Sequence, residues 1–129
     1  MSAHHGRMLV VDAANVVGSR PNGWWRDRGK AAADLCSGLI DAINAGRLEP
    51  PVVVVLEGAA RQGVGEREQH GLRVVHAPRS GDDTIADVVA EMVADGQTVT
   101  VVTADRELRD RARRVGSEVV GPRWLLDRV

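Results

Sequence analysis

Residues 8–12 read MLVVD, an apolar run that ends in an aspartate, and this stretch decides the fold. A short continuous apolar run is typical of a strand that is buried on both faces of a parallel sheet. Residues 52–56 (VVVVL) and 98–103 (TVTVVT) have the same character. Residues 72–76 and 118–120 are predicted to be shorter strands, and the partial alternation of 72–76 places it at a sheet edge.

Helical patterns separate these strands. Residues 30–45 form an apolar stripe on one face, and residues 82–95 form a second one around Ile85 and Val89. Residues 106–115 are predicted to be a helix that Gly116 caps, and residues 122–128 a last turn. Residues 15–29 are predicted to be a loop, and residues 57–71 a polar segment with one helical turn. This alternation predicts a three-layer α/β/α sandwich around a mostly parallel five-stranded sheet.

Composition limits the class of protein. The 129 residues suit one domain, with residues 1–7 as a flexible end, and the absence of Phe and Tyr leaves a core of aliphatic residues. Cys36 is the only cysteine, which excludes an internal disulfide and a cysteine-based zinc site. No signal peptide or membrane-length run is evident, so we expect a cytoplasmic protein. The net charge of −1 means that any nucleic-acid site must be a local patch.

Acidic residues follow the strands. Asp12 ends the first strand, and Asp105 lies two residues past the strand at 98–103. The carboxyl ends of neighbouring parallel strands share one sheet edge, so these acids are expected to converge there. Two carboxylates about 4 Å apart repel by roughly 4 kcal/mol at an effective dielectric constant near 20. Mg²⁺ or Mn²⁺ would relieve this repulsion, since both prefer oxygen ligands. Each aspartate could instead simply cap a helix or turn.

A second acidic group begins the helix at 82–95. Residues 80–83 (SGDD) resemble a capping box, with Ser80 as the cap. Asp83 and Asp87 are four residues apart, on one side of the helix and away from its apolar stripe. Such a like-charge pair is unfavourable unless a cation lies between, so we predict Asp83 and Asp87 as metal ligands. Asp82 is expected to support them.

Other polar residues lie close to these acids in the sequence. Asn15 could orient Asp12 or a metal-bound water, although Asn also favours turns. Thr103 offers a hydroxyl at the end of its strand, and Glu57 follows the strand at 52–56. A solvated strand-end acid is the alternative interpretation of Glu57.

Residues 19–28 (SRPNGWWRDR) combine indoles with guanidinium groups. Exposed indoles can stack on unpaired bases, and arginines bind phosphates, which favours single-stranded or loop RNA over duplex. One tryptophan could instead cap the core while the arginines are solvated. The predicted RNA-binding residues are Arg20, Trp24, Trp25, Arg26 and Arg28.

Together these segments resemble the NYN branch of PIN-like nucleases, which includes the YacP-like proteins. The resemblance rests on residues 10–18 (VVDAANVVG), 52–58 (VVVVLEG), 80–89 (SGDDTIADVV), 101–108 (VVTADREL) and 116–126 (GSEVVGPRWLL). It implies a parallel sheet of strand order 3-2-1-4-5, a divalent-metal site at its carboxyl edge and cleavage of RNA. Carried over by position, Asp12, Asp83 and Asp105 are the implied metal-binding and catalytic acids, with Asp87 and Asn15 in support.

The sequence hypothesis is therefore a ribonuclease that uses Mg²⁺ or Mn²⁺ to hydrolyse phosphodiester bonds. We expect RNA as the partner and no membrane contact, and a homodimer is left open. The first alternative is a PIN-like module that binds RNA or another partner without turnover. The second is a phosphoacceptor or phosphatase domain, which would need a lysine near its aspartate. Lys30 is the only lysine and lies at a predicted helix start.

Overall fold

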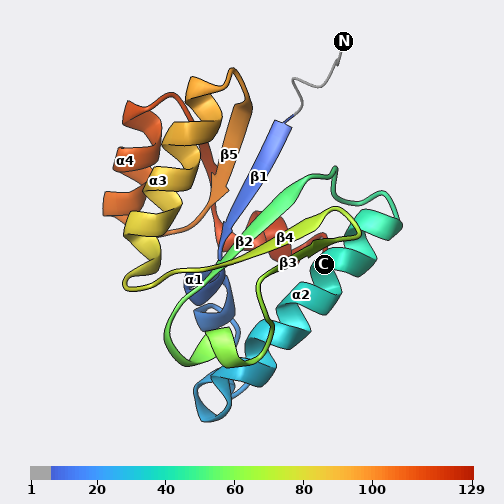
Figure 1. The fold of residues 1–129 in the computed structure, drawn as a ribbon. Helices are drawn as coiled ribbons and strands as arrows, with labels where there is room; N and C mark the ends of the chain where they lie inside the picture. The colour runs from blue at the N-terminus through green and yellow to red at the C-terminus, as the bar shows by residue number, and fades with distance from the viewer. Residues whose placement is uncertain (1–6) are drawn as a thin grey trace.

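The computed structural model describes residues 7–129. Its strands are β1 (Arg7–Asp12), β2 (Val52–Leu56), β3 (Arg67–Gln69), β4 (Leu72–His76), β5 (Thr98–Val102) and β6 (Glu118–Val120). Its helices are α1 (Ala13–Gly18), α2 (Arg28–Asn44), α3 (Gly81–Ala94), α4 (Arg106–Arg114) and α5 (Pro122–Leu126). Two 3₁₀ helices, η1 (Trp24–Arg26) and η2 (Gly58–Gln62), complete the order (Figure 1).

The strands form one sheet of order β3-β4-β2-β1-β5-β6. All neighbouring pairs are parallel except β3 and β4, which are antiparallel. The five predicted strands therefore lie in the predicted order 3-2-1-4-5, and β1 is central. The register pairs Asp12 with Val55 and Val11 with Val102, so β1, β2 and β5 end at the same edge.

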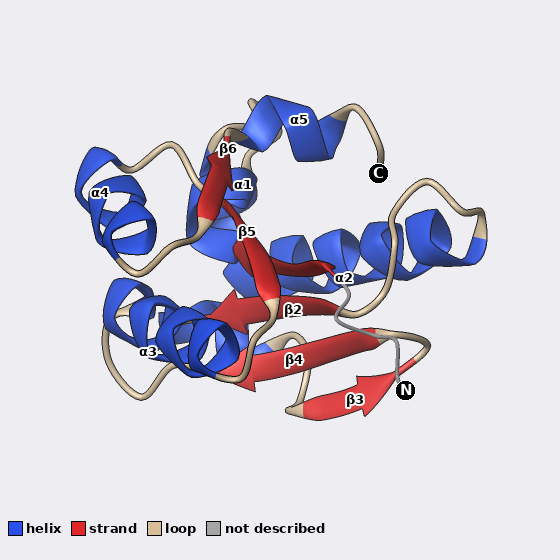
Figure 2. Ribbon diagram, turned by 90° about the horizontal axis from the view of Figure 1, so that it is seen from above, coloured by secondary structure: helices blue, strands red, loops and turns tan. Residues whose placement is uncertain are grey.

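Two apolar cores lie on opposite faces of this sheet. Alternate residues of the strands point to each side, as the pleat requires. On one face, Leu9 and Val11 pack with α1, α2 and α5; on the other, Val10 packs with α3 and α4. Figure 2 shows the helices divided between these two layers. The three-layer α/β sandwich predicted from the sequence is confirmed.

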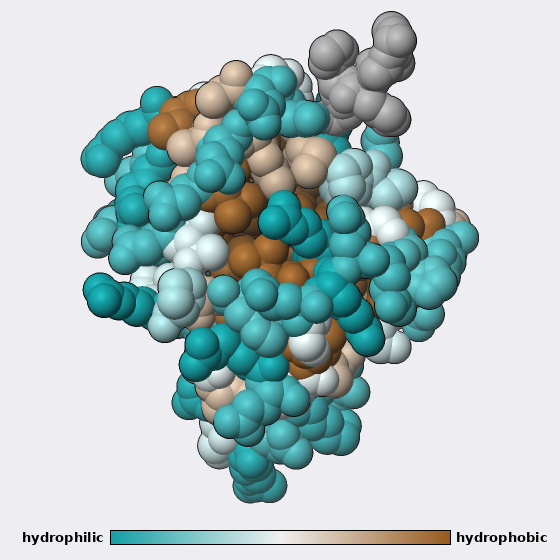
Figure 3. Space-filling model, in the orientation of Figure 1, coloured by the Kyte–Doolittle hydropathy of each residue, from teal (hydrophilic) through white to brown (hydrophobic). Residues whose placement is uncertain are grey.

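Helices α3 and α4 leave part of their face of the sheet uncovered. In Figure 3 the surface is mostly hydrophilic, with an apolar area beside α3 over the middle of the sheet. Met8, Val75 and Met92 are partly buried hydrophobic residues that pack against the core on this face. Among residues 7–129, no helix has the length and apolar character needed to cross a membrane.

Three local predictions were wrong. The predicted loop at 15–29 contains most of α1 and all of η1, because Asp12 accepts a hydrogen bond from the Asn15 amide and so starts a helix directly after β1. The strand at 72–76 is not at an edge, since β3 pairs with it. Arg7 belongs to β1 rather than to a flexible end. Residues 1–6 of that predicted end lie outside the described residues.

Candidate metal centre

Asp12 lies at the carboxyl end of the central strand and is almost fully buried, with 4% of its surface exposed. Its Oδ2 accepts a hydrogen bond from Thr103 Oγ1 at 2.9 Å, and its Oδ1 accepts one from the Asn15 amide at 3.3 Å. These two donors fix the carboxylate relative to β5 and α1. Asp12 thus caps α1 and also faces the sheet edge, so the two interpretations from the sequence are compatible.

Burial raises the pKa of Asp12 to about 6, from an ordinary value of 3.8. The hydrogen bonds from Thr103 and Asn15 stabilise the charged form and lower the pKa, but desolvation outweighs them. The negative charges of Asp82 and Glu57 raise the pKa further. Asp12 therefore lies in a desolvated site with other acids nearby, and none of the ion pairs among residues 7–129 involves it.

Thr103 and Asn15 join the loop after β5 to the rest of the site. Thr103 is fully buried, and its Oγ1 also accepts a hydrogen bond from the Asp105 amide at 3.1 Å. Asn15 Oδ1 accepts a hydrogen bond from the Ala104 amide at 2.8 Å. The side-chain oxygen of Asn15 is thus used to position a loop, which makes Asn15 a positioning residue for Asp12 and Asp105.

Asp105 begins α4 as its cap, since its Oδ1 accepts a hydrogen bond from the Leu108 amide at 2.9 Å. The capping interpretation is correct for one of its oxygens. The same carboxylate is close enough to Asp82 for their repulsion to raise the pKa of Asp82. Asp105 therefore contributes charge to the site as well as ending the loop.

Asp82 lies at the centre of these acids, although the sequence analysis gave it only a supporting role. Desolvation is the largest cause that raises its pKa, repulsion from Asp105 and then Glu57 raises it further, and the positive charge of Arg111 offsets part of this rise. Glu57 lies against the start of α3, where a Cβ built on Gly81 would be 2.8 Å from Glu57 Oε1. Asp12, Glu57, Asp82 and Asp105 are called the acid cluster below.

Asp83 points elsewhere. Its Oδ1 pairs with Arg111 Nη1 of α4 at 3.1 Å, and 71% of its side chain is exposed. Its amide donates to Ser80 Oγ at 3.4 Å, so the predicted cap at Ser80 is confirmed. Asp87 is exposed one turn further along α3. The spacing of Asp83 and Asp87 predicted a cation beside this face of the helix, and the structure places the Arg111 guanidinium there.

Helix geometry explains why Asp82, rather than Asp83, lies beside the other members of the acid cluster. Ile85 and Val89 are the fully buried residues of α3. Asp82 precedes Ile85 by three residues, so it lies on the same face and projects past the core toward the strand ends. Asp83 precedes Ile85 by two and lies on the opposite face. The apolar stripe of Ile85 and Val89 therefore indicates from the sequence that Asp82 is on the side of α3 that faces the sheet.

The donor set suits a hard divalent cation, because it consists of carboxylates in a partly desolvated site. Among residues 7–129, however, no group of three or more His, Cys, Asp or Glu side chains is placed to hold a metal ion together. Mg²⁺ usually binds one or two carboxylates and keeps several waters. Direct ligation by one or two members of the acid cluster, with water between the ion and the others, is therefore the arrangement that fits.

Of the predicted RNA-binding residues, Trp24 and Arg28 meet in space. Arg28 Cζ lies 5.1 Å from the centre of the Trp24 ring, and Trp25 packs edge-on against Trp24 at 6.1 Å. Trp25 is 56% exposed, with Arg26 Cζ 5.7 Å from its ring centre. Arg20 is half-buried beyond the end of α1. The two indoles thus differ: Trp24 faces inward and Trp25 faces solvent.

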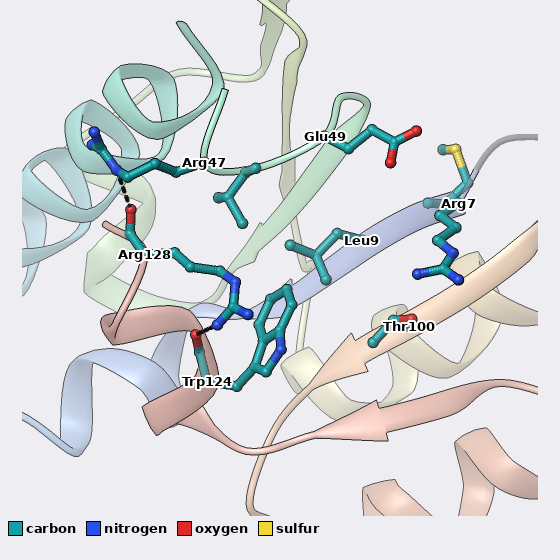
Figure 4. Close-up of a pocket in the computed structure, with 9 residues that line it drawn as sticks. Arg7, Leu9, Arg47, Glu49, Thr100, Trp124 and Arg128 are labelled. Atoms are coloured by element: carbon teal, nitrogen blue, oxygen red, sulfur yellow. Dashed lines mark hydrogen bonds between the residues drawn. The ribbon is translucent and has the colours of Figure 1, made fainter. Parts of the chain in front are cut away.

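A separate pocket of about 160 Å³ lies near the start of β1, at the opposite end of the strand from Asp12. Figure 4 shows Arg128 beside Trp124, with Arg47 and Arg7 on either side. The Arg128 guanidinium lies 3.9 Å from the Trp124 ring centre and donates to the Trp124 carbonyl at 2.6 Å. Glu49 is the one acidic residue among those lining the pocket, so the pocket offers no second carboxylate for a divalent cation.

A mostly parallel sheet of this order, with acids at the carboxyl ends of its central strands, defines a PIN-like α/β domain. The model of the YacP-like NYN domain matches residues 9–129, and the chain belongs to this family.

Two crystal structures of Rae1 (YacP) from Bacillus subtilis, one of them of a mutant, are similar to this chain. They have TM-scores of 0.68 and 0.69 and 19% sequence identity, and the alignments cover 93% of this chain and 72% and 71% of theirs. At this identity the likeness shows a shared fold. No curated protein matches the sequence significantly.

Proposed function

We propose that this protein is a divalent-metal-dependent ribonuclease that hydrolyses phosphodiester bonds in single-stranded or loop RNA. The observation that carries the proposal is the acid cluster at the carboxyl end of the central strand, where burial and neighbouring acids raise the pKa values of both Asp12 and Asp82. A structural role would favour pairing these acids with cations, as Asp83 is paired with Arg111. Membership in the NYN family supports the same function.

Asp12 and Asp82 would hold Mg²⁺ or Mn²⁺ directly, and Asp105 and Glu57 would act through water. When bound, the ion would supply charge stabilisation at the phosphate and lower the pKa of a bound water. Thr103 and Asn15 would keep Asp12 and the Asp105 loop in place, since both side chains already hold them by hydrogen bonds. Arg26 and Arg28 would contact phosphates along the RNA strand.

Lys30 argues against the phosphoacceptor alternative. A phosphoacceptor aspartate needs a lysine close to it, but Lys30 Nζ pairs with Asp34 at 2.9 Å on the exposed surface of α2. The structure thus gives Lys30 a partner on its own helix rather than at Asp12.

The test is cleavage of mixed single-stranded and duplex RNAs over a titration of Mn²⁺ and of Mg²⁺. Wild-type protein should cleave single-stranded RNA only with metal, and Asp12→Asn should abolish cleavage. Asp87→Asn is the matched control, because Asp87 carries the same charge on exposed α3 surface. RNA binding without metal-dependent cleavage would favour the non-catalytic module. Cleavage that persists in Asp12→Asn would overturn the proposal.

A further inference from the structure

A cavity of about 270 Å³ lies beside the acid cluster, between α1, the start of α2 and η2. Ala13, Ala14 and Val17 of α1 form one side, and Ala60 of η2 contributes to the other. Trp24 and Arg28 line it together, with the guanidinium 5.1 Å from the indole centre. This space is called the indole pocket below.

The indole pocket adjoins the proposed metal centre through the chain itself. Ala13 and Ala14 directly follow Asp12, and Glu57 belongs both to the acid cluster and to the lining of the pocket. A group bound in the pocket would therefore lie next to a phosphate that is held at the acid cluster.

The chemistry of the pocket suits one planar ring system. Its volume of about 270 Å³ lies just below the range of about 300–1,000 Å³ found for pockets that hold drug-sized ligands, so it suits a smaller ligand. Alanine side chains and an indole offer flat apolar surface, and Arg28 offers donors and positive charge at the rim. A nucleobase has a planar apolar face with polar edges, and aromatic side chains bind such faces by stacking.

The surface beyond Arg28 suits the backbone that would carry this base. A shallow groove of about 480 Å³ is lined by Arg26, Arg28 and Lys30, with Asp27 as its one acidic residue. Arg28 lines both the groove and the indole pocket. A negatively charged strand could therefore leave the pocket along a mainly cationic path.

The groove and the pocket both lie between α2 and η2. A Cβ on Gly63 would lie 1.8 Å from the Gly29 carbonyl oxygen, so the segment after η2 packs backbone to backbone on the start of α2. The cavity is thus held between elements that are in direct contact, which favours a preformed site.

We infer that the indole pocket binds one unstacked RNA base adjacent to the cleaved phosphate, and that it determines the base preference of cleavage. This inference rests on the proposed function for its reaction, but the binding step can be tested without metal. Paired bases cannot enter the pocket, because a duplex keeps them stacked.

The binding experiment uses short fluorescent RNAs and wild-type protein in EDTA. Trp24→Ala should weaken binding by about five- to 150-fold, the range that corresponds to one stacked base. Ala14→Trp, at an exposed position lining the pocket, should weaken it comparably by filling the space. Trp124→Ala is the matched control and should bind RNA like wild type, since Trp124 lines the separate pocket near the start of β1.

RNAs with one abasic position test directly whether the pocket binds a base. One abasic position should weaken binding to wild-type protein by the same factor as Trp24→Ala, and it should cost Trp24→Ala nothing more. Circular dichroism checks that each variant is folded, and the two pocket variants substitute for each other if one is not. Additive losses from the abasic position and Trp24→Ala would overturn the inference.

A cleavage assay distinguishes a failure of this inference from a failure of the proposed function. If wild-type protein cleaves with Mn²⁺, Ala14→Trp should redistribute cleavage among the bases while Trp124→Ala should not. Unchanged rates and cleavage positions in both pocket variants would overturn the base pocket and leave the nuclease intact. If no protein cleaves, the binding comparison still decides whether the pocket takes a base.

Discussion

Replacing Asp12 with asparagine should remove a large part of the pH dependence of stability. Asp12 has a pKa of about 6 in the folded protein against 3.8 ordinarily. Between these values the folded state binds more protons than the unfolded state, so stability falls as pH rises. Each pKa unit corresponds to about 1.4 kcal/mol, so the shift amounts to about 3 kcal/mol. This stability is present below the ordinary value and is lost above pH 6.

The asparagine variant keeps the shape of the site without the charge. Its carbonyl oxygen can still accept from the Asn15 amide, and Thr103 can rotate its hydroxyl to accept from the new amide group. Urea unfolding of both proteins in EDTA, at steps from about pH 4 to pH 7.5, measures the difference. Other carboxylates titrate in both proteins, so they largely cancel.

The variant should gain about 2.4 kcal/mol relative to wild type between the two ends of this range, because pH 4 already lies above the ordinary pKa of the carboxyl. Adding Mn²⁺ near pH 7 should stabilise wild type, by about 2.7 kcal/mol at one hundred times the dissociation constant, and should barely affect the variant. Parallel stability curves that differ by a constant amount would show that Asp12 titrates normally, and this would refute the account of its burial and repulsion.

Three further substitutions test the structure around the site. Gly63→Ala should cost about 1–3 kcal/mol in urea unfolding, because its Cβ would overlap the backbone of α2, whereas Gly65→Ala, with open space around it, should be nearly neutral. Gly81→Ala should change stability by less than about 1 kcal/mol, since only the flexible end of Glu57 must move, yet it should weaken Mn²⁺ binding in a titration. Ile85→Ala should lower the free energy of unfolding by about 2–5 kcal/mol in calorimetry or urea unfolding, because Ile85 is fully buried on the inner face of α3.

The strands β1 and β2 could be predicted because their apolar runs are unbroken. Residues 52–56 are buried at every position, and the predicted bounds are those of β2. The edge strand β3 could not be predicted in this way, since its three residues are all exposed and polar. It forms because β4 offers a free edge within hairpin distance, which is a property of the fold rather than of the local sequence.

The site was predictable by region but not by residue. Asp12 and Asp105 follow buried strands, and sequence alone places such residues at the carboxyl edge. The choice between Asp82 and Asp83 depends on which face of α3 meets the sheet, and like-charge spacing selected Asp83, which pairs with Arg111. Arg111, the partner of Asp83, is 28 residues away, so helix packing alone brings the two together.

The predicted loop at 15–29 shows the same limit. Its composition predicted nucleic-acid contact, but this segment contains most of α1 and all of η1, which bring Trp24 against α1 and leave Trp25 in solvent. The distinction between a pocket wall and an exposed indole comes from these helices. Alternation of polar and apolar residues does not encode it.

Direct Mn²⁺ binding tests most plainly whether the acid cluster is a metal centre. Electron paramagnetic resonance of free Mn²⁺ measures uptake by wild type, Asp12→Asn, Asp82→Asn and Asp83→Asn. We expect wild type and Asp83→Asn to bind with similar affinity, while Asp12→Asn and Asp82→Asn lose at least about tenfold. No uptake by wild type, or a loss in Asp83→Asn with Asp82→Asn unaffected, would contradict the assignment.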